Sequence, residues 1–149
     1  MFVVDTNVLV YAADTFSPFH DRCSSRLAEW RPRREVWFLT WGICYEFLRV
    51  VTHRRVLRRP WDRSSALGYI EALLASPGLA VLTETDRHLD IVRAVVDETP
   101  SLNGNLFHDA HTAILMREHG IRRIVTNDSD FHRFEFLEVV DPFAGGGPA

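Results

Sequence analysis

Residues 2–12, FVVDTNVLVYA, place a carboxylate in the middle of an apolar stretch near the start of the chain. A charged side chain is costly to bury unless it is paired or neutralised, so packing alone does not explain Asp5. We interpret the three apolar residues before Asp5 as a short buried strand. A helix that Thr6 or Asn7 caps then runs to Ala13. This interpretation puts the Asp5 carboxylate at the carboxyl end of the first strand.

The rest of the chain alternates short apolar segments with longer segments of helical periodicity. The pattern predicts strands at 36–39, 79–83, 122–126 and 137–142, and helices within 17–30 and at 41–52, 64–75, 86–96 and 105–119. Thr40 is the expected N-cap of the helix at 41–52, and Gly120 ends the last helix. Strands that alternate with helices in this way predict an α/β fold, in which a parallel five-stranded sheet is flanked by helices on both faces.

The composition is that of an ordinary globular domain. The chain has 149 residues, of which 46% are hydrophobic and 25% charged, with a net charge of −3. We expect one domain over residues 1–143 and a flexible tail at 144–149. Cys23 and Cys44 have neither zinc-site spacing nor a disulfide framework, which is typical of a reduced, intracellular protein. The N-terminal apolar run is too short to span a membrane and lacks a basic leader, so we expect a cytoplasmic protein.

Acidic residues recur at the expected carboxyl ends of the strands, where α/β sheets bind their ligands. Asp5 follows the first strand, Glu46 lies on the helix after the second, and Asp128 follows the fourth. Asp109 lies at the edge of the apolar stripe of the helix at 105–119. The sequence therefore predicts one acidic site built from four separate elements.

Each acid also has an ordinary structural interpretation. Asp5 can be a helix N-cap, and Glu46 can pair with Arg49 one helical turn away. A solvated helix face accounts for Asp109, and turns that favour Asp account for the acids after the fourth strand. Their joint placement at one end of the predicted sheet favours a shared site.

Carboxylates that share a cleft repel one another and require a cation. A donor set of oxygens, without convergent histidine or cysteine, suits Mg²⁺ or Mn²⁺. Such an ion supports hydrolysis of a phosphodiester. We expect Asp5 and Asp109 to be the strongest ligands, and Glu46 and Asp128 to complete the site directly or through water.

Four short motifs resemble, in their order and spacing, those of the PIN-domain ribonucleases, and most closely those of the VapC-type toxins of bacterial toxin–antitoxin pairs. They are VVDTNVLVYA with Asp5, CYEFLRV with Glu46, NLFHDAHTA with Asp109, and IVTNDSDF with Thr126, Asp128 and Asp130. The resemblance spans residues 2–142. Either Asp128 or Asp130 can be the fourth acid of the family. We favour Asp128, with Asp130 orienting Thr126 or a metal-bound water and with Asn7 in support.

The resemblance implies a Mg²⁺- or Mn²⁺-dependent endoribonuclease, the toxin of a type II toxin–antitoxin pair. It further implies a homodimer and a cognate VapB-like antitoxin whose C-terminal segment blocks the acidic cleft. Two alternatives remain. One is a PIN-domain nuclease that processes RNA and is not a toxin. The other is a non-catalytic module of the same fold that binds RNA or protein.

A basic segment and two histidines lie close to these motifs. The segment HRRVLRRPWDR offers phosphate contacts and an aromatic ring, Trp61, which suits binding of single-stranded RNA. A solvated loop or a partner-binding loop explains the same residues. The candidate RNA-binding residues are Arg54, Arg55, Arg58 and Arg59. His108 and His111 flank Asp109, and we expect them to be structural or to lie at the rim of the cleft.

Overall fold

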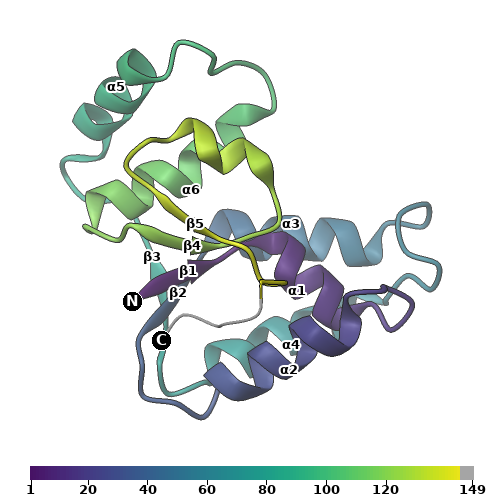
Figure 1. Cartoon of the computed structure of the whole chain (residues 1–149). Coiled ribbons are helices and arrows are strands. Elements are labelled where there is room, and N and C mark those ends of the chain that lie inside the picture. The colour runs from purple at the N-terminus through teal and green to yellow at the C-terminus, as the bar shows by residue number, and fades with distance from the viewer. Residues whose placement is uncertain (145–149) are drawn as a thin grey trace.

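The computed structural model describes residues 1–144, which form one α/β domain around a five-stranded sheet (Figure 1). Every neighbouring pair of strands is parallel, and the strand order is β3-β2-β1-β4-β5. The strands are β1 (Phe2–Val4), β2 (Trp37–Thr40), β3 (Leu79–Leu82), β4 (Arg123–Val125) and β5 (Glu138–Val140). The chain therefore starts in the centre of the sheet, where all three residues of β1 are buried. The predicted fold class is confirmed.

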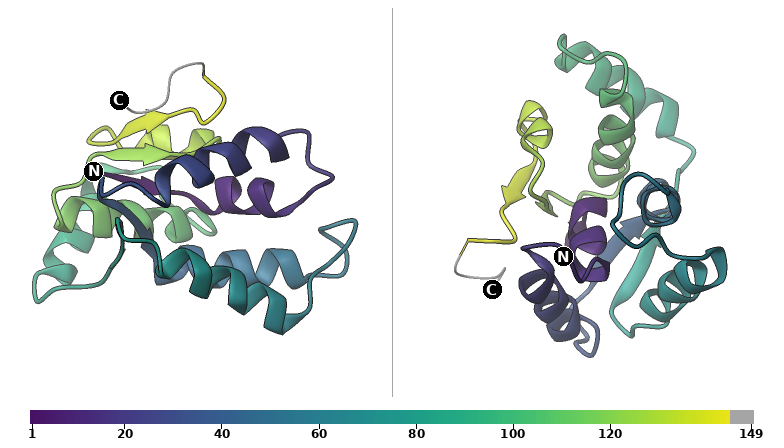
Figure 2. Two further views of the ribbon diagram at one scale, coloured as in Figure 1. Left: turned by 90° about the horizontal axis from the view of Figure 1, so that it is seen from below. Right: turned by 90° about the vertical axis from the view of Figure 1, so that its right-hand side faces the viewer.

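In the described part of the chain, six α-helices cover both faces of the sheet (Figure 2). They are α1 (Thr6–Ala13), α2 (His20–Trp30), α3 (Trp41–Thr52), α4 (Arg63–Leu74), α5 (His88–Glu98) and α6 (Leu106–Glu118). In Figure 1, α5 and α6 lie at the top and α2 and α4 at the bottom. Among residues 1–144, no helix combines the length and the apolar character needed to cross a membrane.

Side-chain caps start two helices, α1 and α3, directly after a strand. Asp5 caps α1 by accepting a hydrogen bond from the Thr6 amide, which confirms the interpretation of Asp5 as an N-cap and contradicts a cap at Thr6 or Asn7. The Thr40 hydroxyl accepts a hydrogen bond from the Ile43 amide, as expected, and starts α3 at the last residue of β2. Such caps satisfy backbone donors that the first helical turn leaves free.

The structure departs from the predicted boundaries in a few places. Helix α5 begins at His88, two residues after the predicted start, and α4 begins one residue early because Asp62 caps it. A 3₁₀ helix, η1 (Ser129–Arg133), follows β4, and the sequence pattern did not predict it. Gly120 has a φ of 68°, the left-handed conformation expected at the end of α6. Of the predicted flexible tail, residues 145–149 lie outside the described part of the chain.

Candidate active site

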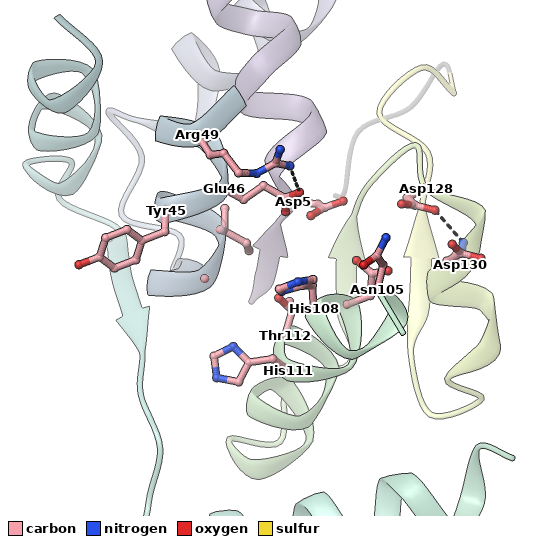
Figure 3. A pocket seen from close by; sticks show the side chains of 13 residues that line it. Asp5, Tyr45, Glu46, Arg49, Asn105, His108, His111, Thr112, Asp128 and Asp130 are labelled. Carbon is pink, nitrogen blue, oxygen red and sulfur yellow. Dashed lines mark hydrogen bonds and ion pairs between the residues drawn. The ribbon is translucent and has the colours of Figure 1, made fainter. Parts of the chain in front are cut away.

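A pocket opens at the carboxyl edge of the sheet, beside the ends of β1 and β4 (Figure 3). Strands β1 and β4 are neighbours, and helix α3 leaves the sheet from the adjacent strand β2. The parallel arrangement therefore brings residues that are far apart in sequence to one edge. All the predicted acids line this pocket, namely Asp5, Glu46, Asp109, Asp128 and Asp130.

Asp5 is the most tightly held of these acids, and only 8% of its surface is exposed. One carboxylate oxygen accepts the Thr6 amide at 2.7 Å. The other accepts the Thr126 hydroxyl at 2.6 Å and the Asn7 side-chain amide at 2.8 Å. Asp5 is thus both a helix cap and a member of the acidic site, and its two interpretations do not compete.

Thr126 is the residue that connects Asp5 with the turn after β4. Its buried hydroxyl donates to Asp5 and accepts hydrogen bonds from the Asn7 side chain at 2.8 Å and the Asp128 amide at 2.9 Å. Of the two roles expected for Asp130, the first, orienting Thr126, belongs in the structure to Asp5, Asn7 and the Asp128 backbone. The second, orienting a metal-bound water, stays a prediction. Asp130 pairs instead with Arg133, at 3.1 Å.

We expect Thr126→Val to lower the free energy of unfolding by about 1–3 kcal/mol, because the shape is kept while buried partners lose their hydrogen bonds. Thr126→Ser keeps the hydroxyl and should lose much less stability. Chemical denaturation of both variants measures the difference. Equal stability of the valine and serine variants would mean that the hydroxyl does not hold the site together.

Glu46 reaches the cleft from the middle of α3. One of its oxygens accepts the Thr6 hydroxyl at 3.2 Å, and the other pairs with Arg49 at 3.3 Å. Both side chains of this ion pair are well exposed, 44% for Glu46 and 64% for Arg49, so the pair contributes little stability. Glu46 is therefore available to the cleft even though the predicted i,i+3 pair forms.

Asp109, Asp128 and Asp130 form the most compact set of acids. One carboxylate oxygen from each lies within 4.8 Å of the other two. The Asp130 amide donates to the Asp128 carboxylate at 2.8 Å, which fixes the turn that carries both side chains. The sequence leaves open whether Asp128 or Asp130 joins Asp109, and in the structure both do. Asp5 and Glu46 line the same pocket but lie outside this set.

The acids of the cleft disfavour one another's ionisation. Burial raises the pKa of Asp109 to about 7, and the charges of Asp128, Asp5, Asp130 and Glu46 add to the effect. Burial also raises the pKa of Asp5 to about 6, although hydrogen bonds from Thr126 and Thr6 oppose the rise. These carboxylates are hard to ionise together at neutral pH, so a positive charge bound between them would be favourable.

A divalent cation fits this donor set. Ionised carboxylates that converge without nitrogen or sulfur ligands are typical of sites for hard cations. The polar support around Asp5 and Asp128 holds their side chains in place before any ion arrives.

The pocket is also lined by side chains that the sequence did not single out as functional, three of which are long or polar and reach the acids' surroundings. They are Tyr45, Arg49 and Asn105. Helical spacing offered a signal for two of them, since Arg49 and Asn105 lie one turn from Glu46 and Asp109. Tyr45 is 70% exposed, and adjacency to Glu46 was its only signal.

Two histidines lie at the acidic pocket, and one of them also belongs to a second group of side chains. His108 and His111 both line the pocket, which places them at the rim as expected. The group of Asp109, Asp128 and Asp130 offers only oxygen ligands, as expected. His111 also comes together with His88 and Glu84 in a separate group, which the sequence did not predict. These residues lie on different elements, and packing of α5 against α6 unites them, so sequence spacing gives no sign of the cluster.

The basic segment lies outside the acidic pocket. Its four candidate arginines are exposed, and none lines the pocket among the described residues. Arg58 and Arg59 lie over the Phe16 ring, at 4.8 and 5.3 Å from its centroid. The Trp61 ring is half-buried and packs edge-on against Phe47 and Tyr69, so stacking of a base on its remaining exposed part stays a prediction.

Comparison with known proteins places these features in a family context. A family model described as PIN domain matches residues 2–137. Ribonuclease VapC48 of Mycobacterium tuberculosis is 36% identical over 141 residues, which cover 95% of this chain and 97% of that protein. The structure is similar to that of VapBC2 from Rickettsia felis bound to a DNA fragment from its promoter, with a TM-score of 0.67 and 16% identity. The match covers 93% of this chain and 96% of that chain. It is also similar to VapC20 of Mycobacterium tuberculosis, described as a sarcin-ricin loop cleaving toxin, with a TM-score of 0.64 and 19% identity. That match covers 89% of this chain and 93% of that chain.

Proposed function

This chain belongs to the PIN-domain family, and from that premise we propose that it is a Mg²⁺- or Mn²⁺-dependent endoribonuclease, the toxin of a type II toxin–antitoxin pair. The observation that carries the proposal is the pocket at the carboxyl edge of the sheet, where acids from separate elements converge. The intact set of acids favours catalysis over a purely binding role. The name of the relative VapC48 supports RNA as the substrate class.

The acids divide into those that hold the cation and those that act around it. Asp109, Asp128 and Asp130 would hold the ion, because their oxygens already converge. When bound, a divalent cation lowers the pKa of water and stabilises charge on the phosphate group. Asp5, fixed by its hydrogen bonds, supplies a negative charge at the end of β1. Glu46 reaches the open cleft and accepts the proton that the attacking water releases.

The assembly that we propose includes a second copy of the chain and an antitoxin. A VapB-like antitoxin, with a C-terminal segment that covers the acidic pocket, would silence the nuclease. The structural similarity to VapBC2, whose name joins a VapB and a VapC component, supports this partner. We propose a cytoplasmic location, where RNA and the antitoxin are both present.

We further propose that the basic segment after α3 contacts RNA outside the cleft. The double variant Arg54→Ser/Arg55→Ser should weaken RNA binding and make it less dependent on salt. If both residues neutralise phosphates of single-stranded RNA, the slope of log K against log salt should change by about 1.4. Fluorescence anisotropy with Asp109→Asn protein, which should not cut the probe, measures both quantities.

A matched control exists at the opposite edge of the sheet. Arg34 and Arg122 are exposed and precede β2 and β4, so they lie at the amino ends of the strands, away from the pocket. Arg34→Ser/Arg122→Ser makes the same change in net charge. Equal loss of affinity in the two double variants would assign the effect to overall charge and would contradict a local RNA contact.

The proposed activity is tested by incubating the purified chain with total cellular RNA and Mg²⁺ and mapping the new ends. We expect cuts at defined internal positions, absent with Asp5→Ala or Asp109→Asn. Cleavage by both variants at the wild-type rate would show that the acids are not the active site. RNA binding without cleavage under Mg²⁺ or Mn²⁺ would favour the non-catalytic alternative.

The toxin role has a separate test. Expression of the wild-type chain should arrest bacterial growth, and co-expression of a small protein encoded next to it should relieve the arrest. Asp109→Asn, expressed to the same level, serves as the inactive control. Normal growth with abundant, soluble, RNA-cleaving protein would favour a PIN-domain nuclease that is not a toxin.

A further inference from the structure

A second group of ligand-type side chains lies beside the acidic pocket, where α5 packs against α6. Glu84 lies in the connection between β3 and α5, His88 is the first residue of α5, and His111 lies on α6. One ligand atom from each lies within 4.8 Å of the other two. The His111 Nε2 atom is 3.0 Å from a Glu84 oxygen. In Figure 3 the His111 ring is turned away from Asp128 and Asp130.

A buried carboxylate holds His88 in place. Glu118 is only 4% exposed, and one of its oxygens lies 2.7 Å from Nδ1 of His88. Its other oxygen accepts the Thr85 amide at 2.6 Å and also the Thr85 hydroxyl. An ionised Glu118 therefore requires the proton of a neutral His88 to be on Nδ1, which leaves the Nε2 lone pair free. A histidine whose second nitrogen donates to a carboxylate is the usual arrangement around protein-bound metals.

We propose that Glu84, His88 and His111 form a second metal site, which binds Zn²⁺ or a similar transition-metal ion. Two imidazoles and one carboxylate are ligands that suit zinc, whereas the neighbouring acidic cluster, with oxygens only, suits Mg²⁺ or Mn²⁺. The two sites thus differ in ligand chemistry and prefer different ions.

The position of this site gives it a structural consequence. His111 lines the acidic pocket, and it lies two residues after Asp109 on the same helix. A metal held by all three residues ties the start of α5 to α6, the helix that carries Asp109. Zinc should therefore raise the thermal stability of the protein in addition to binding.

The test is a zinc titration of the untagged full-length chain by isothermal calorimetry, with Mg²⁺ in large excess to occupy the acidic cluster. We expect one tight Zn²⁺ per chain and a zinc-dependent rise in Tm. His88→Gln and His111→Gln should each remove both effects. His108→Gln is the matched control, because His108 lies on the same helix and lines the pocket but is not one of the three proposed ligands. It should bind zinc as the wild type does.

Glu118→Gln separates a metal site from a merely structural cluster. A glutamine oriented by Thr85 presents its NH₂ group to His88 and favours the proton on Nε2, the nitrogen that the metal needs. Zinc affinity should fall by about 10- to 100-fold. Thermal melting without zinc identifies any variant that fails to fold. His111→Gln should still fold, because its partner Glu84 is exposed and does not depend on His111 for burial.

Two results would overturn the proposal. One is the absence of tight zinc binding by the wild type under excess Mg²⁺. The other is zinc binding that survives in both His88→Gln and His111→Gln but is lost in Asp109→Asn, which would assign the zinc to the acidic cluster.

Discussion

Asp109→Asn is expected to lower the rate of RNA cleavage by about 1000-fold. Removing a ligand of the cation removes several kcal/mol of transition-state stabilisation, and each loss of about 1.4 kcal/mol slows the reaction about tenfold. The same change should make the metal-free protein more stable at neutral pH. Burial and the surrounding acids hold the pKa of Asp109 at about 7, so ionising it costs free energy. The cleft is open to solvent, and we expect a gain of about 1 kcal/mol.

This pair of opposite effects separates an active-site acid from a structural one. The cleavage rate and the free energy of unfolding in EDTA are the two measurements. Asp97→Asn is the control, since Asp97 is exposed on α5 and makes the same charge change far from the pocket. A variant of Asp109 that loses activity and stability together would indicate that Asp109 serves the fold and not the cation.

Removal of divalent cations is expected to abolish cleavage and to make stability depend on pH in a definite direction. The pKa values of Asp5 and Asp109 are raised from 3.8 to about 6 and about 7. A group whose pKa is higher in the folded state contributes its stability fully below its unfolded pKa and loses it as the pH rises through the folded value. The acidic site of the metal-free protein should therefore lose stability between about pH 4 and about pH 7.

Added Mg²⁺ should reverse this loss. At a concentration of 100 times its Kd, a ligand that binds only the folded state stabilises it by about 2.7 kcal/mol. The stabilisation should be larger at about pH 8 than at about pH 5, because protons compete for the carboxylates at low pH. Thermal melts in EDTA and in Mg²⁺ across this range measure it, and Asp109→Asn isolates the part due to the site. Equal pH dependence of wild type and variant, with no response to Mg²⁺, would contradict a cation site.

Much of the fold was predictable because local rules and tertiary packing agree. Short apolar strands that alternate with helices predicted the parallel five-stranded sheet, and Thr40 was correctly predicted as the cap of α3. For α1, Asp5 is the cap and not Thr6 or Asn7, since Asp5 directly follows the strand and accepts the first free amide of the helix. The 3₁₀ helix after β4 was missed because Asp128 and Asp130 read as turn residues, and a single helical turn has no periodicity to detect.

The acidic site was more predictable than its surroundings. Carboxyl ends of parallel strands converge by geometry, so the acids could be grouped from sequence, and the predicted family is confirmed. Which acids approach most closely depends on the turn after β4, where Asp130 joins Asp109 and Asp128. Contacts that depend on how helices pack against one another could not be predicted from the sequence pattern. The packing of the half-buried Trp61 ring and the convergence of His88 with His111 are of this kind.

The most direct test of the central claim is to locate Mn²⁺ by its anomalous X-ray scattering in crystals of the wild-type chain. We predict a peak among the carboxylates of Asp109, Asp128 and Asp130, within about 2.0–2.3 Å of their oxygens, as hard cations require. Protein from the same preparation should cleave RNA with Mn²⁺. Active protein whose crystals hold manganese elsewhere, with no peak among these acids, would contradict the account.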